Sequence, residues 1–118
     1  MLWDHYPYTR ELACSTNLIT NVVELSHWLM ACMNGGVYFS RVLQPVSVAA
    51  LWTPGYQEPW GWPAVGYNAG FFTAQYTEAG IEPQRMVFTG GGMPGVHVHA
   101  TLFPESGVGA VVFANLHS

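Results

Sequence analysis

The feature that most constrains the fold is a stretch of strict two-residue alternation near the end of the chain. From residue 96 to 103 a small or aliphatic side chain alternates with a bulkier or polar one. The first set is Val96, Val98, Ala100 and Leu102, and the second set is His97, His99, Thr101 and Phe103. Because successive side chains of a β-strand point to opposite faces, this pattern predicts a strand with one apolar face.

The residues around this strand predict an antiparallel arrangement. The sequence PESG at residues 104 to 107 is typical of a hairpin turn with glycine at its end. The sequence VGAVVFAN follows it and is almost wholly apolar, which predicts a strand covered on both faces. Two earlier strands are expected over residues 65 to 76 and 85 to 89. Short links between consecutive strands favour an antiparallel meander.

Two helices are expected ahead of the strands. Asn21 is followed three residues later by Glu24, which resembles a capping box, so the first helix should begin near Asn21. The N-G-G sequence at residues 34 to 36 supplies the left-handed residue that ends it. Its apolar face should comprise Leu18, Val22, Leu25, Leu29 and Cys32. A second, shorter helix should begin at Pro45 and must stop before Pro54.

These elements together predict an α+β fold. About four strands would form an antiparallel β-meander, and the two helices would pack on one face of it. The 118 residues are enough for one domain with one core. No internal repeat, low-complexity tract or second domain is visible in the sequence.

Charged residues are scarce, at 8% of the chain, whereas about 25% is usual for soluble domains. We infer that other protein covers much of the surface, either more of the same chain or a partner. The net charge of −4 argues against a nucleic-acid surface. Gly, Pro, Asn and Thr interrupt every apolar run, so no transmembrane segment is expected, and the first residues lack a signal-peptide pattern. Cys14 and Cys32 are interpreted as reduced and buried, with a disulfide left open for a secreted parent protein.

The glycines at 90, 92 and 95 spell G-x-G-x-x-G, the pattern of a phosphate-binding loop. Such a loop needs a helix after the glycines, or a Lys that reaches the phosphates. Here a strand pattern follows and the chain contains no Lys, so we expect a glycine-rich turn instead, and no cofactor. His97 and His99 share one face of their strand and could reach a common metal ion, but no further ligand stands at a suitable spacing.

An aromatic-rich loop is a further candidate binding feature. Tyr56, Trp60, Trp62 and Tyr67 could form a stacking platform for a sugar or a peptide. Aromatic residues at this density belong more often to a core or an interface, and we favour that interpretation. No G-x-S-x-G sequence marks a serine nucleophile on a sharp turn.

Four segments, in order, resemble the serine β-lactamase-like family, which includes class C β-lactamases, penicillin-binding carboxypeptidases and esterases. ACSTNLITNVVELSHWLMACMNGG is similar to the family's "S-T/N-x-x-D-L-x-x-W" segment and the helix that ends in N-G-G. LQPVSVAALWTP resembles "L-S-P-E-S-V-x-x-L-x-T-P", and VGYNAGFF resembles the "Y-G-L-G-W" strand. TGGGMPGVHVHATLFPESGVGAVVFAN resembles "H-G-G-G-x-P-G-F-x-S-x-x-x-x-x-P-E-x-G-x-G-V-V-V-x-x-N". The resemblance covers roughly residues 11 to 116.

The resemblance implies roles for a few residues of this chain. Thr89, Gly90 and Gly91 match the family's third motif, Lys-Thr-Gly or His-x-Gly, which lies on an edge strand facing the reactive serine. The basic residue of that motif helps to hold the substrate's carboxylate, and here an uncharged Thr89 takes its place. The nucleophile motif Ser-x-x-Lys cannot be present without a Lys, and Tyr-x-Asn is also absent.

Residues 1 to 118 are therefore expected to be a single partial domain. The domain would be the C-terminal portion of a β-lactamase-related serine hydrolase, without the nucleophile region and the closing C-terminal helix. Its parent would hydrolyse an amide or an ester through an acyl-serine, and the chain alone would be inactive. The remainder of the parent domain would be its partner. The alternative is a non-catalytic binding or assembly module with the same fold.

Overall fold

The computed structural model describes residues 10, 11, 13–16, 18–57, 65–93 and 95–115, and it is an α+β fold. Three helices come first: α1 (Ala13–Thr16), α2 (Val22–Met33) and α3 (Pro45–Leu51). A two-stranded ribbon lies between α2 and α3 and consists of β1 (Val37–Tyr38) and β2 (Ser40–Arg41). Among the described residues, no helix combines the length and the apolar character needed to cross a bilayer.

The main sheet has six strands in the order of the chain, and every neighbouring pair is antiparallel. The strands are β3 (Tyr56–Gln57), β4 (Gly66–Asn68), β5 (Phe71–Glu78), β6 (Ile81–Met93), β7 (Val96–Phe103) and β8 (Val108–Ala114). The antiparallel meander is confirmed, but it has two more strands than expected. The segment 65 to 76 was expected to be one strand and instead contains β4 and the start of β5. A turn with positive φ at Ala69 (48°) and Gly70 (90°) separates the two strands.

Both expected helices are present. The Asn21 side chain caps α2 by accepting a hydrogen bond from the backbone N–H of Glu24 at 2.9 Å. Gly35 and Gly36 follow the helix with φ of 62° and 92°, as the N-G-G sequence predicts. Pro45 is the first residue of α3, where its missing N–H costs no helical hydrogen bond.

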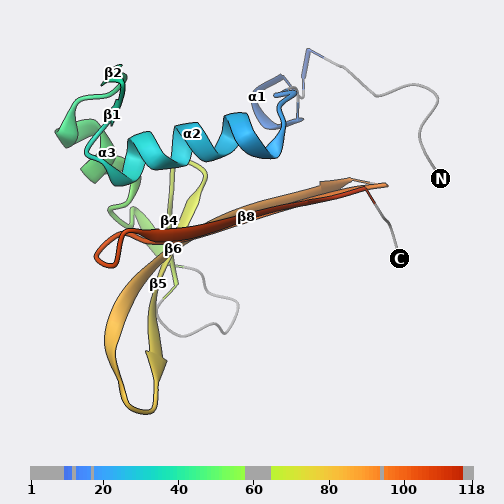
Figure 1. The fold of residues 1–118 in the computed structure, drawn as a ribbon. Coiled ribbons are helices and arrows are strands. Elements are labelled where there is room, and N and C mark those ends of the chain that lie inside the picture. The colour runs from blue at the N-terminus through green and yellow to red at the C-terminus, as the bar shows by residue number, and fades with distance from the viewer. Residues whose placement is uncertain (1–9, 12, 17, 58–64, 94, 116–118) are drawn as a thin grey trace.

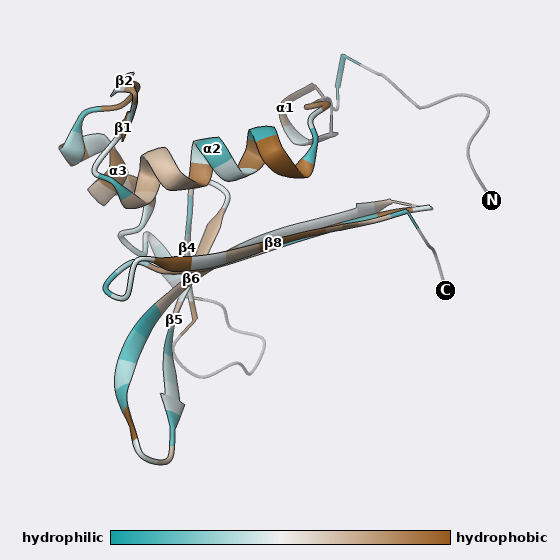
Figure 2. Ribbon diagram, viewed as in Figure 1, coloured by the Kyte–Doolittle hydropathy of each residue, from teal (hydrophilic) through white to brown (hydrophobic). Residues whose placement is uncertain are grey.

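The core lies between the helices and one face of the sheet, which we call the helix face. It contains Leu29 and Cys32 from α2, Val48 and Trp52 from α3 and its end, and Phe71, Val87, Ala100 and Leu102 from the sheet. In Figure 1, α2 lies along one side of β7 and β8. Figure 2 shows that hydrophobic residues recur along α2 and along β8.

Three sequence expectations about burial are wrong. Leu18 precedes the helix and is 81% exposed, and the apolar face of α2 is half-buried at Leu25 and fully buried only at Leu29 and Cys32. Cys14 is exposed whereas Cys32 is buried, and both are free thiols. Strand β8 was expected to be covered on both faces, but it is the last strand of the sheet, and Val112 is 58% exposed.

Candidate functional site

Thr89, Gly90 and Gly91 all lie within β6, which runs without a break from Ile81 to Met93. Of the three glycines expected in a glycine-rich turn, Gly90 and Gly92 are strand residues, so that part of the expectation is wrong, and Gly95, with φ of 87°, lies in the turn. Gly90 and Gly91 pair with His99 and Val98 of β7, and the chain reverses only after Met93. The glycines remain in the strand because β7 hydrogen-bonds alongside them.

The third-motif residues lie on both faces of the sheet, because successive residues of β6 point to opposite sides. Thr89 lies two residues after Val87, which is fully buried in the core, so Thr89 and Gly91 belong to the helix face. The Thr89 hydroxyl donates a hydrogen bond of 2.7 Å to the carbonyl of Gly70 in the turn between β4 and β5. That hydroxyl therefore ties β6 to the neighbouring hairpin. Gly90 belongs to the opposite face, which we call the histidine face.

The last residues of β6 extend beyond the end of its pairing with β5. Strand β5 pairs with β6 from Glu78↔Ile81 to Phe72↔Phe88, whereas β7 continues the pairing as far as Met93. From Gly90 to Gly92, no described strand pairs with the side of β6 that faces away from β7. Backbone N–H and C=O groups on such an edge can bind an extended chain.

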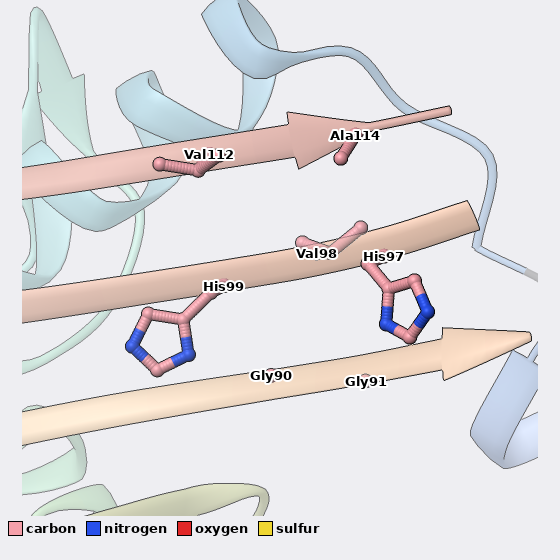
Figure 3. A pocket seen from close by; sticks show the side chains of 7 residues that line it. All are labelled: Gly90, Gly91, His97, Val98, His99, Val112 and Ala114. Atoms are coloured by element: carbon pink, nitrogen blue, oxygen red, sulfur yellow. The ribbon is translucent and has the colours of Figure 1, made fainter. Parts of the chain in front are cut away.

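Both histidines of β7 lie over the glycines of β6 (Figure 3). A Cβ atom at Gly92 would stand 2.6 Å from Nδ1 of His97, and a Cβ atom at Gly90 would stand 3.2 Å from Nδ1 of His99. The absence of side chains on β6 thus leaves room for the imidazole rings. This cross-strand packing of rings on glycine gives the glycines a structural role.

A shallow groove of about 380 Å³ opens at the same place. Its lining consists of Gly90, Gly91, His97, Val98, His99, Val112 and Ala114, from strands β6, β7 and β8 (Figure 3). The groove contains two imidazoles, an open stretch of backbone and a few aliphatic side chains. Such a lining suits a flat or extended ligand with both apolar and hydrogen-bonding groups.

A metal ion would need more ligands than the groove supplies. No three His, Cys, Asp or Glu side chains come together anywhere in the described part of the chain. Nε2 of His99 is hydrogen-bonded to the hydroxyl of Thr101 at 2.8 Å. Burial raises the pKa of the Cys32 thiol to about 11, so Cys32 is a protonated core residue rather than a ligand or nucleophile.

The sequence did not reveal a row of rings that crosses the histidine face. Tyr67 of β4 lies 4.8 Å from Phe72 of β5, measured between ring centroids. Phe72 stacks on Phe88 of β6 at 5.3 Å, and Phe88 stacks on His99 of β7 at 6.4 Å. These four residues form what we call the aromatic row. Each ring occupies a different strand, so only the pairing register could have placed them together.

The predicted aromatic platform is only partly visible. Tyr56 and Tyr67 are cross-strand partners in β3 and β4, and they are 56% and 38% exposed. Trp60 and Trp62 lie outside the described residues. The structure thus links Tyr67 to the aromatic row, and no described helix covers that row.

No protein family model, no curated protein and no solved structure matches this chain.

Proposed function

We propose that this chain is the C-terminal part of a β-lactamase-related serine hydrolase domain. In the parent reaction a serine oxygen attacks the carbonyl carbon of an amide or ester, and the amine or alcohol departs. Water then releases the acyl group as a carboxylic acid. The observation that carries the proposal is the edge of β6 at Gly90–Gly92, which no described strand other than β7 pairs with, directly after Thr89 and beside the open groove.

This edge suits an acyl substrate for a physical reason. An extended substrate can pair its amide groups with the backbone of a free strand edge, as an added β-strand does. Gly91 has open space where a Cβ atom would stand, so the strand offers little steric hindrance there. The uncharged Thr89 supplies no cation for a substrate carboxylate. This favours substrates that carry no carboxylate beside the amide or ester.

The chain alone should not turn over such substrates. It contains no Lys, so a serine activated by Lys in a Ser-x-x-Lys sequence is absent. The buried Cys32 remains a thiol at neutral pH because its pKa is about 11. The reactive serine and its base would come from another part of the parent domain.

The test is a turnover assay on the purified chain with nitrocefin and with p-nitrophenyl acetate. We expect no sustained hydrolysis above buffer. The exposed thiol of Cys14 could be acylated once by the ester, so Cys14→Ser is the matched control variant. Multiple turnovers that persist in Cys14→Ser would mean that this chain contains its own nucleophile, contrary to the proposal.

The coding sequence in frame ahead of Met1, read from the messenger RNA, provides the positive test. We expect Ser-x-x-Lys and Tyr-x-Asn within a few hundred codons. A polypeptide extended to include them should hydrolyse at least one of the two substrates.

The second candidate function is a non-catalytic binding or assembly module. Thr89 favours this second candidate. It stands where the hydrolase family has a basic residue, but it is uncharged and its hydroxyl donates a hydrogen bond to the Gly70 carbonyl. The aromatic row, which no described helix covers, also favours a binding role. An in-frame sequence without Ser-x-x-Lys and Tyr-x-Asn would support this candidate and remove the hydrolase.

A further inference from the structure

We propose that a second copy of this chain pairs with β8, so that two six-stranded sheets become one continuous antiparallel sheet. Strand β8 ends the strand order, and among the described strands it pairs only with β7. Its outer edge therefore presents a row of backbone N–H and C=O groups that can bind another strand. This inference does not depend on the proposed catalytic function.

Nothing on β8 blocks such pairing. Proteins usually protect an edge strand with charge, proline or a β-bulge. The seven residues of β8, VGAVVFA, contain neither a charged residue nor a proline. Their pairing with β7 runs from Phe103↔Val108 to His97↔Ala114 without a shift of register. Val108 and Val112 are 59% and 58% exposed, so apolar surface accompanies the open edge.

The sequence of β8 is complementary to itself in one register. If Val111 lies on the two-fold axis and faces its own copy, all seven residues find partners. On the histidine face, Val108 then faces Ala114 and Val112 faces Ala110, so a large side chain always meets a small one. On the helix face, Phe113 meets Gly109, which has no side chain. A shift by two residues in either direction leaves part of the strand unpaired.

The symmetry also suits the helices. Residues directly opposite in an antiparallel pair point to the same face, so a two-fold axis perpendicular to the sheet keeps both helical layers on one side. Met33 of α2 lies near Gly109 of β8, since a Cβ atom there would be 3.7 Å from the Met33 methyl. Val23 and Met30 of α2 are 57% and 50% exposed, so α2 carries apolar surface beyond the part that packs on the sheet.

The first experiment is sedimentation velocity of the purified chain at micromolar concentration. We expect a dimer that Val112→Lys converts to monomer, because a two-fold pairing places two new charges beside the shared edge. Val46→Lys is the matched control, since Val46 is 75% exposed on α3 and takes no part in the proposed strand pairing, so its variant should remain dimeric. A wild-type monomer, or a dimer unaffected by Val112→Lys, would overturn the proposal. Co-purification of a different polypeptide along the β8 edge would also overturn it.

The second experiment tests the register with one cysteine introduced at a time in a Cys14→Ser background, where the buried Cys32 is the only native thiol. Val111→Cys should form a disulfide between copies under mild oxidation, because cross-strand partners have Cα atoms about 4.5–5.5 Å apart. Val108→Cys is the control. Its nearest copy would be displaced by six residues, about 20 Å along the strand, so no disulfide should form. Cross-linking of both variants or of neither would overturn the register.

Discussion

Truncating Leu102 should destabilise this domain more than truncating Phe88, although Phe88 has the larger side chain. Leu102 is 2% exposed and belongs to the core between the helices and the sheet. Phe88 is half-buried on the histidine face, and its ring stacks on Phe72 at 5.3 Å and on His99 at 6.4 Å between centroids. The comparison therefore measures how much of the stability resides on each face of the sheet.

The expected magnitudes follow from burial. Replacing a fully buried leucine with alanine costs about 2–5 kcal/mol of unfolding free energy, because the transfer free energy of the removed atoms is lost and a cavity remains. A core phenylalanine would cost about 3–5 kcal/mol. Phe88 should cost only about 1–2 kcal/mol, since each aromatic pair contributes about 0.5–1.5 kcal/mol and the ring is already partly in water. For a domain of this size, the melting temperature should fall by about 3–6 °C for each kcal/mol.

The assay is urea unfolding of both variants at one protein concentration, since association changes apparent stability. Tryptophan fluorescence can report the transition, because Trp52 is buried and its ring lies 6.4 Å from that of Phe71. We expect Leu102→Ala to lower the midpoint clearly more than Phe88→Ala. Equal losses would refute the reasoning, because they would mean that the histidine face is packed as tightly as the core.

Four further predictions concern single positions. Asn21→Ala should cost about 1 kcal/mol in urea unfolding, because the helix loses the side chain that caps it, whereas Asn21→Ser should retain most of the stability. Gly66→Ala should cost more than a surface substitution, because the new Cβ atom would stand 2.7 Å from Cγ of the rigid Pro54 ring; an unchanged melting temperature would contradict this contact. Thr73→Val should stabilise the domain or leave it unchanged, because the Thr73 hydroxyl is buried without a hydrogen-bond partner among the described residues. The contribution of Cys32 burial to stability should be fully present below pH 9.0 and decline as the pH rises toward about 11. The reason is that the thiol ionises at a lower pH in the unfolded chain than in the folded one. The variant Cys32→Ala should lack this decline.

Local sequence signals predicted helices α2 and α3 and the hairpin between β7 and β8. The Asn21 cap and the proline at Pro45 act within a single turn of chain, so their effect can be read without knowledge of the fold. The alternation over residues 96 to 103 predicted which face of β7 is buried, and Ala100 and Leu102 are indeed core residues. These signals depend on neighbours in the sequence.

The features that the sequence did not predict depend on residues that are distant in the chain and close in space. The apolar sequence of β8 predicted cover on both faces, but its histidine face is open, with Val108 and Val112 59% and 58% exposed. The glycines at 90 to 92 predicted a turn, but pairing with β7 keeps them in a strand. The aromatic row required the registers of three strand pairs, which no local pattern in the sequence specifies.

The most direct test of the proposed function is the intact mass of the protein after incubation with benzylpenicillin or a fluorophosphonate. These reagents acylate or phosphonylate an activated serine and leave ordinary serines unmodified. We predict that the 118-residue chain gains no mass, whereas a polypeptide extended through Ser-x-x-Lys gains one adduct on that serine. An adduct on any serine within residues 1 to 118 would contradict the account.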